Sequence, residues 1–127
     1  MTCLATAATL CYMLPVRESA LSQLRRGALE FCVLGLLRDR ERYSYEIVRG
    51  LGQFDGLVTT EGTLYPLLGR LRKEGVVHTT WRESTAGPPR RYYRLTDVGR
   101  TQLDAFAVEW VRFRDSVDTL LVRGGDT

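Results

Sequence analysis

The sequence predicts a mainly α-helical fold that carries one small β-hairpin and a long helix at its C-terminal end. Apolar residues recur at helical spacing through much of the chain, whereas residues 76–95 are rich in β-branched and aromatic side chains. A long apolar repeat then runs from residue 103 to residue 120. The 127 residues are enough for one domain with a core of modest size.

The chain begins with a stretch that we expect to lie outside the folded domain. Residues 1–21 are interpreted as an N-terminal extension, disordered or loosely helical, whose apolar run superficially resembles a signal peptide. No basic residue precedes that run, and it is too short to span a bilayer. We therefore expect a cytoplasmic protein without a membrane segment, with secretion as the alternative. The three cysteines have no CxxC spacing, so we expect no disulfide framework, metal site or other cofactor.

The first predicted helix starts near Ser22 and ends in the charged stretch 38–42. Its apolar residues recur at i, i+3, i+4, i+7 and i+8, which is the spacing of a stripe that faces a core. Arg25 and Arg26 fall on other faces of this helix. The apolar stripe consists of Leu29, Cys32, Val33, Leu36 and Leu37.

A second, shorter helix is predicted from Ser44 to about Leu51. Ser44 is expected to cap it, because a serine hydroxyl can accept from the free N–H groups of the first helical turn. Tyr45 is expected to be available for burial together with the apolar residues that follow. Gly52 and Gly56 break the chain afterwards.

The central predicted helix is bounded by Thr60, a suitable N-cap, and Gly75, a suitable residue to end it. Leucines at 64, 67, 68 and 71 form an apolar stripe, which must lie against a core. The opposite face carries small or hydroxylated residues at its start and cations further along, as a helix that enters a DNA groove requires. Tyr65 lies off the stripe, so we favour a phosphate contact for it over burial. The candidate DNA-binding residues of this segment are Thr60, Gly62, Thr63, Tyr65, Pro66, Arg70 and Lys73.

A β-hairpin is predicted after this helix, with strands at 76–82 and 90–95 and a turn between them. Arg90 and Arg91 stand at the base of its tip and complete the candidate DNA-binding set. Three helices followed by such a hairpin make a winged helix-turn-helix domain, which we assign to residues 22–95. The alternative is a small α+β domain with an incidental hairpin.

The positive charge is concentrated in the same region. Residues 60–95 hold seven Arg or Lys against three acids, whereas the rest of the chain holds eleven against twelve, for a net charge of +3. A localised excess of this kind indicates a nucleic-acid footprint, and a solvated basic face is the alternative.

The C-terminal segment, residues 96–127, is predicted to be a long helix capped by Thr96 and running to about Val122. Its large apolar residues are spaced 3, 4, 3, 4 and 3, which is the seam of a coiled coil. At ~1.5 Å per residue the helix is roughly 39 Å long, more than the preceding domain can cover. We expect the seam to form a homodimer; the alternative is that the N-terminal extension folds over it. The seam residues are Leu103, Phe106, Trp110, Phe113, Val117 and Leu120.

The chain resembles the PadR family of bacterial transcriptional regulators from about Leu24 to Leu121. Four segments carry the resemblance: residues 29–37, residues 43–47, the GTLYP sequence at 62–66 and the GPPRRYYRLT sequence at 87–96. The resemblance implies a dimeric winged-helix regulator, usually a repressor, that binds an operator in double-stranded DNA. In such a protein Thr63 and Tyr65 match positions of the groove helix that meet DNA, Arg90 and Arg91 match basic positions of the wing, and the C-terminal helix forms the dimer.

Trp110 is also a candidate effector-binding residue. In some members of the family that the chain resembles, a tryptophan at this position stacks on planar aromatic ligands between the subunits. Trp110 either does the same or merely fills the dimer interface. Arg112 and Arg114 nearby make an anionic aromatic molecule, such as a phenolic acid, more suitable than a cationic one.

These observations predict a sequence-specific DNA-binding transcriptional regulator, a repressor released by a small-molecule effector. The alternative is a winged-helix protein-interaction module that dimerises without sequence-specific DNA binding, for which a less basic and more apolar surface is expected. An enzyme is not expected, because the sequence offers no nucleophile with a base, no paired carboxylates on an apolar face and no phosphate-binding glycine loop.

Overall fold

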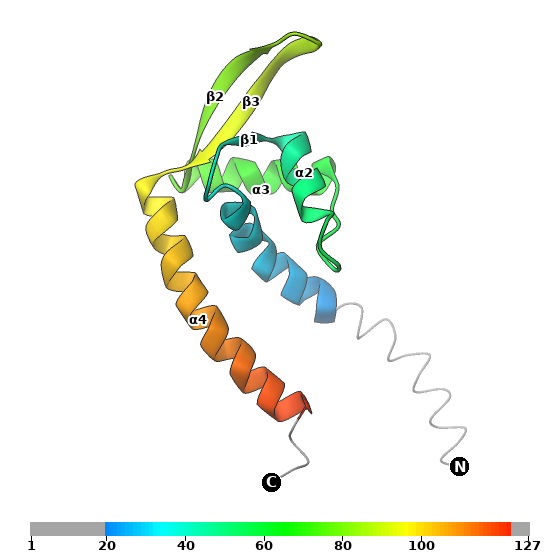
Figure 1. Ribbon diagram of the computed structural model, residues 1–127, viewed down its shortest axis with the longest axis vertical. Helices are drawn as coiled ribbons and strands as arrows, with labels where there is room; N and C mark the ends of the chain where they lie inside the picture. The colour runs from blue at the N-terminus through cyan, green and yellow to red at the C-terminus, as the bar shows by residue number, and fades with distance from the viewer. Residues whose placement is uncertain (1–19, 123–127) are drawn as a thin grey trace, which may run out of the picture.

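The computed structural model of the protein describes residues 20–122 (Figure 1). Helices make up most of this region, and a small antiparallel sheet stands at one end of it, which confirms the predicted fold class. Residues 20 and 21 already belong to the first helix, and residues 1–19 of the predicted extension lie outside the described residues. The elements are a helix at residues 20–36, β1 (Arg42–Tyr43), α2 (Ser44–Leu51), α3 (Glu61–Lys73), β2 (Val77–Ser84), β3 (Gly87–Leu95) and α4 (Asp97–Val122).

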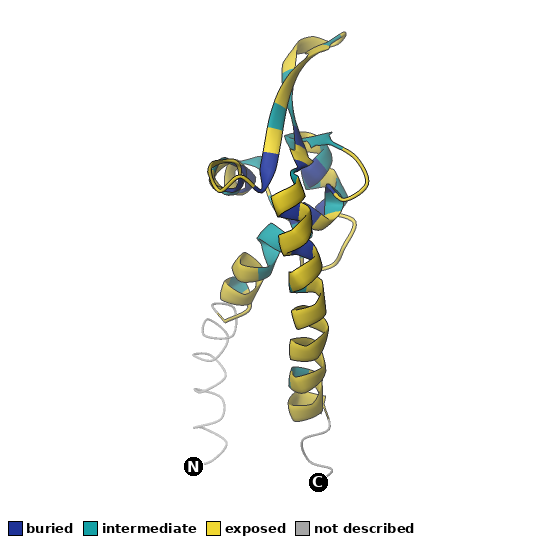
Figure 2. Ribbon diagram, turned by 90° about the vertical axis from the view of Figure 1, so that its left-hand side faces the viewer, coloured by how far each residue is buried: buried dark blue, intermediate teal, exposed yellow. Residues whose placement is uncertain are grey.

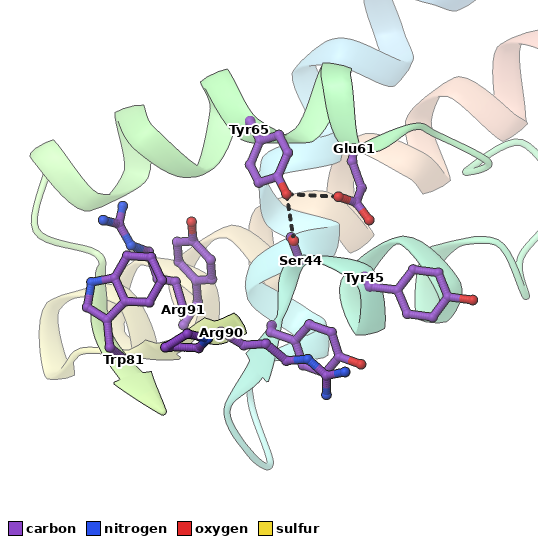
Figure 3. A pocket seen from close by; sticks show the side chains of 10 residues that line it. Ser44, Tyr45, Glu61, Tyr65, Trp81, Arg90 and Arg91 are labelled. Atoms are coloured by element: carbon purple, nitrogen blue, oxygen red, sulfur yellow. Dashed lines mark hydrogen bonds between the residues drawn. The ribbon is translucent and has the colours of Figure 1, made fainter. Parts of the chain in front are cut away.

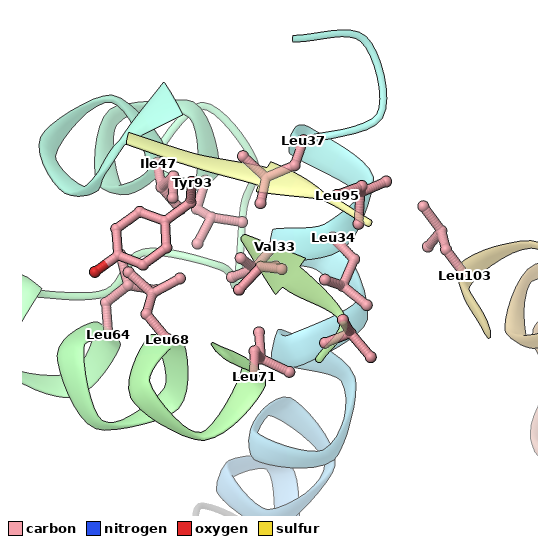
Figure 4. Packing of buried hydrophobic residues seen from close by; sticks show 13 residues of the cluster. Val33, Leu34, Leu37, Ile47, Leu64, Leu68, Leu71, Tyr93, Leu95 and Leu103 are labelled. Carbon is pink, nitrogen blue, oxygen red and sulfur yellow. The ribbon is translucent and has the colours of Figure 1, made fainter. Parts of the chain in front are cut away.

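One apolar core joins the first helix, α2, α3 and the base of the sheet (Figure 4). The predicted stripe of α3 is confirmed, because Leu64, Leu68 and Leu71 are fully buried, while Leu67 packs against the edge of the core. Cys32 of the first helix also packs against it, and burial raises the pKa of its thiol. The remaining buried apolar residues are Val33, Leu34, Leu37, Ile47, Leu51, Val76, Val77, Tyr93, Leu95 and Leu103.

The sheet has three strands in the order β1-β3-β2, one more than the sequence predicts. The extra strand, β1, lies in what we expected to be a charged linker: Arg42 pairs with Tyr93 and Tyr43 with Tyr92. Its side chains gave no strand signal because the strand is only two residues long. The guanidinium of Arg42 donates to the carbonyl oxygen of Leu36 at 2.7 Å and so ties the strand to the end of the first helix.

The hairpin is longer than predicted, and its turn is reduced to Thr85 and Ala86. Pro88 and Pro89 belong to β3, although proline cannot donate to a strand ladder. They are tolerated because the ladder is irregular between Arg82 and Ser84 and because β1 does not extend to this part of β3. The hairpin therefore projects from the body as a wing (Figure 1).

The predicted cap of α3 is confirmed and that of α2 is wrong. The hydroxyl of Thr60 accepts from the N–H of Thr63 at 3.3 Å, and Gly75 has a φ of 78°, which glycine adopts without strain. In α2, the N-cap position belongs to Tyr43, whose N–H donates to the carboxylate of Glu46 at 3.2 Å. Ser44 is the first helical residue, and its hydroxyl is directed to α3 instead. Tyr45 is exposed rather than buried.

The helix α4 divides at about Phe106 into a packed part and a projecting part. Thr96 caps it by accepting from the N–H of Gly99 at 3.0 Å, as expected. Leu103 is buried in the core, and Phe106 lies parallel to Phe31 of the first helix, with ring centroids 3.7 Å apart. Beyond this point α4 extends away from the body, and all its residues except Val117 are exposed (Figure 2). The predicted seam is thus partly used within the chain. Within residues 20–122 no helix combines the length and apolar character that a membrane crossing requires.

Candidate nucleic-acid interface

The first two turns of α3 present a polar, exposed face. Thr60, Gly62, Thr63, Tyr65 and Pro66 are exposed or partly exposed there, while the leucine stripe holds the other face against the core. Pro66 has no N–H, so the carbonyl oxygen of Gly62 lacks its usual helical donor and keeps its capacity to accept. Small side chains and free polar groups are what a helix needs to approach base edges closely.

The side chain of Tyr65 is held in place by neighbours on both sides (Figure 3). Its hydroxyl donates to the carboxylate of Glu61 at 2.8 Å and accepts from the hydroxyl of Ser44 at 3.3 Å. The ring is 51% exposed, so Tyr65 is not a core residue. Ser44, at the start of α2, thereby links the two helices of the helix-turn-helix.

A cavity of about 490 Å³ separates the start of α3 from the wing. Arg90 lies over the ring of Tyr43, with its guanidinium carbon 4.4 Å from the ring centroid, and Arg91 lies over Trp81 at 4.8 Å. The cavity is lined by Tyr43, Ser44, Tyr45, Glu61, Tyr65, Trp81, Pro89, Arg90, Arg91 and Tyr93 (Figure 3).

The aromatic rings orient the two guanidinium groups of the wing. A guanidinium stacked on a ring keeps its full charge and keeps its in-plane N–H donors for planar or bidentate acceptors such as phosphate. The Nε of Arg91 is buried and has no hydrogen-bond partner among the described residues. The cavity therefore combines two positioned cations with the start of α3, from which Glu61 and Tyr65 line it.

Of the DNA-binding residues predicted in residues 60–73, only Tyr65 lines this cavity, and the others lie outside it. Arg70 is already paired with Glu30 of the first helix at 3.3 Å and with Glu74 at 3.4 Å. Lys73 is exposed in the last turn of α3, away from the cavity. The candidate face is therefore centred on the first two turns of the helix rather than spread along its length.

Seven residues that line the cavity were absent from the predicted set: Tyr43, Ser44, Tyr45, Glu61, Trp81, Pro89 and Tyr93. For Trp81 the sequence contained a usable signal, because the hairpin register places it directly opposite Arg91. Tyr43 and Ser44 could not be found in this way, since their position depends on the pairing of β1 with β3.

A second, apolar cleft of about 270 Å³ lies between the first helix and α4. Trp110 stands in a row of aromatic rings, with centroids 6.2 Å from Phe106 and 6.1 Å from Phe113. The other residues that line this cleft are Gln23, Leu24, Gly27, Ala28 and Glu109. The cleft contains a carboxylate and no cation.

The two arginines that suggested an anionic ligand are engaged elsewhere. Arg112 pairs with Glu109 at 3.6 Å, and Arg114 pairs with Asp115 at 3.2 Å. The cleft therefore offers no particular attraction to an anion, contrary to the expectation from the sequence, and an uncharged planar aromatic molecule suits it better.

Solved structures of similar proteins align with most of this chain. A PadR-family transcriptional regulator from Eggerthella lenta DSM 2243 is 34% identical with a TM-score of 0.75, and the match covers 87% of this chain and 96% of the other. A PadR-like transcriptional regulator from Bacillus cereus strain ATCC 14579 is 37% identical with a TM-score of 0.71, covering 78% and 96%. PadR from Bacillus subtilis, crystallised with operator DNA, is 30% identical with a TM-score of 0.57, covering 63% of this chain and 46% of that one.

The family match agrees with these structures and spans more than half of the chain. The PadR-like family of transcriptional regulators matches residues 33–105, which include the core of the first helix, α2, α3, the wing and the start of α4. A family of regulators rather than enzymes also confirms the prediction of a protein without catalytic activity. The resemblance seen in the sequence is therefore correct, and this chain belongs to the PadR-like family of transcriptional regulators.

Proposed function

We propose that this protein is a sequence-specific regulator that binds an operator in double-stranded DNA. The carrying observation is the single cavity that borders both the polar start of α3 and the stacked arginines of the wing. In this proposal Thr63 and its exposed neighbours read base edges in the major groove, and Arg90 and Arg91 neutralise phosphates. Base contacts then set sequence preference, while phosphate contacts set register and most of the affinity.

Two further observations favour DNA over a protein partner. The wing cavity is cationic, whereas the centre of a protein interface is usually depleted of charge. PadR from Bacillus subtilis, which is 30% identical, was crystallised with operator DNA. A regulator that binds operator DNA must be in the compartment that contains this DNA, and we therefore propose that this protein is cytoplasmic.

We further propose that the protein acts as a homodimer formed by α4. The projecting part of this helix exposes large apolar side chains, among them Phe113 at 55% and Leu120 at 72% of their surface. An apolar row of this length, which also contains Trp110 and Val117, is stabilised when a second copy covers it. A dimer would also present two recognition helices, the α3 helix of each subunit, to successive major grooves about 34 Å apart.

We also propose that the protein represses transcription when it is bound to its operator, and that a small-molecule effector relieves this repression. The aromatic cleft around Trp110 lies between the first helix and α4, and α4 is the element that would set the position of one subunit against the other. A planar aromatic molecule bound there would change the spacing of the recognition helices and hence the affinity for the operator.

The test of the proposed function is selection of bound fragments from a pool of random duplexes with the full chain. We expect a two-fold symmetric consensus and a binding constant that falls with salt. If a dimer neutralises about eight phosphates, the logarithm of affinity should fall with the logarithm of salt concentration at a slope near −7. Failure to enrich any sequence, together with binding that ignores salt, would favour the interaction-module alternative.

A further inference from the structure

A second cationic cavity borders the start of α3 on the flank opposite the wing. It has a volume of about 370 Å³ and separates the first helix from the segment that leads into α3. The polar residues of its lining are Ser22, Arg25 and Arg26 on one side and Thr59, Thr60 and Thr63 on the other. In Figures 1 and 2 the hairpin and the N-terminal part of the first helix lie on opposite sides of α3.

The two arginines of this cavity are available for a ligand. Arg25 and Arg26 are both exposed, and neither takes part in an ion pair or side-chain hydrogen bond with another residue of the 20–122 region. Among the residues that the structure describes, no carboxylate lines the cavity. Glu30, the next acid along the first helix, is paired with Arg70, and Glu61 faces the wing cavity instead.

We infer that Arg25 and Arg26 bind the phosphate backbone on the second wall of the major groove. A helix lying in the groove, which is about 12 Å wide, has a phosphate strand along each of its flanks. The wing arginines serve one flank, and the first helix places beside the other flank two cations that have no ion-pair partner within residues 20–122. Thr60 and Thr63 lie between the two pairs, with their hydroxyl oxygens 3.3 Å apart.

This inference rests on the proposed function, because it extends the DNA footprint of the same helix. It makes the first helix an interaction surface as well as a core element, since its apolar stripe packs in or against the core while Arg25 and Arg26 are exposed. The predicted DNA-binding set did not contain these two arginines, because the sequence does not reveal that the start of the first helix returns to the start of α3.

The experiment measures binding of the full chain to the selected duplex by fluorescence anisotropy over a range of salt concentrations. Replacing both Arg25 and Arg26 by Ala should make the slope shallower by about 1.8 per bound chain, since each phosphate contact contributes about 0.9. The preference for the selected duplex over a scrambled one should remain. Replacing both by Lys should restore the slope, because counterion release depends on charge rather than on guanidinium geometry.

The matched control removes two arginines from α4, Arg112→Ala with Arg114→Ala, and should leave the slope unchanged. Ethylation of individual phosphates in the duplex tests the same point with the natural chain, and we expect interference on both backbone strands that flank the groove. If the Arg25 and Arg26 variant keeps the full slope while Arg90→Ala with Arg91→Ala flattens it, DNA binding stands and this inference fails. If the natural chain shows no salt-dependent binding, the proposed function itself fails.

Discussion

The hydroxyl of Tyr65 donates its single hydrogen to the carboxylate of Glu61, one helical turn earlier, at 2.8 Å. Both residues line the wing cavity. A phosphate that accepts from Tyr65 must therefore displace Glu61 and also tolerate its negative charge nearby. In the unbound protein this pair restrains the proposed DNA-binding face, while Ser44 holds the tyrosine oxygen from the other side.

Replacing Glu61 by Gln should strengthen DNA binding. Two unit charges about 4 Å apart interact by about 1 kcal/mol even in water, which corresponds to roughly fivefold in affinity. Anisotropy titrations of the selected duplex provide the measurement, and Glu74→Gln at the other end of α3 is the control with the same charge change. If the Glu61→Gln variant instead bound more weakly because it lost discrimination at one base pair of the duplex, Glu61 would be assigned to base readout.

The wing should set mainly the salt dependence of DNA binding, and α3 should set mainly its sequence preference. Replacing Arg90 and Arg91 by Ala should flatten the salt slope by about 1.8 per bound chain and leave sequence preference largely intact. Thr63→Ala should reduce the sequence preference and leave the salt slope largely unchanged. The control, Thr101→Ala on α4, should change neither the slope nor the preference. Titrations of selected and scrambled duplexes at several salt concentrations distinguish these effects; equal loss on both duplexes for Thr63→Ala would remove that residue from base readout.

The elements of this fold with long periodic patterns were predictable, whereas those defined by tertiary pairing were not. The leucine stripe, Thr60 and Gly75 identified α3 because each acts within one or two helical turns. The strand β1 and the wing cavity depend on contacts between segments about fifty residues apart, for example Tyr43 with Tyr92. Such contacts leave no periodic signal in a single sequence.

The apolar repeat of α4 illustrates the same limit. Its spacing was read as one continuous dimer seam, but Leu103 is buried in the core of its own chain and Phe106 stacks on Phe31. Periodicity reports that a face is buried and does not report which surface covers it. Trp110, Phe113, Val117 and Leu120 are the seam residues left for a partner.

A variant that tests the dimer must therefore spare the packed part of the seam. Phe113→Asp with Leu120→Asp should give a monomer, because a dimer would have to bury unpaired carboxylates. Sedimentation velocity at micromolar concentration is the measurement, and the control is Thr101→Asp with Thr119→Asp, whose residues lie off the seam. A monomeric natural chain would contradict the proposed dimer, and a dimeric double variant would place the interface elsewhere.

Gly99 allows the first turn of α4 to pack closely against the backbone of Val76, between α3 and β2. A Cβ atom at this position would stand 2.1 Å from the carbonyl oxygen of Val76, which also accepts from the N–H of Thr96. Gly99→Ala should therefore destabilise the fold by about 3 kcal/mol through overpacking. Gly35→Ala, where nothing lies within 4 Å, should instead stabilise by about 0.5 to 1 kcal/mol. Urea unfolding followed by circular dichroism compares the two, and equal stability of both variants would refute the close contact.

The final prediction concerns the cleft beside Trp110, whose indole is 41% exposed within the described chain. Flat, uncharged aromatic molecules should quench its fluorescence, since stacking contributes about 0.5 to 1.5 kcal/mol per contact and Glu109 disfavours an anion there. Trp81, in the wing cavity, is the internal reference, so quenching should disappear in a Trp110→Phe variant and persist in Trp81→Phe. Ligand occupancy should also weaken operator binding by roughly 5- to 150-fold, the usual range of allosteric coupling. Quenching that survives Trp110→Phe would place the ligand elsewhere. Quenching without any change in DNA affinity would leave Trp110 as a binding residue and eliminate relief of repression through this cleft.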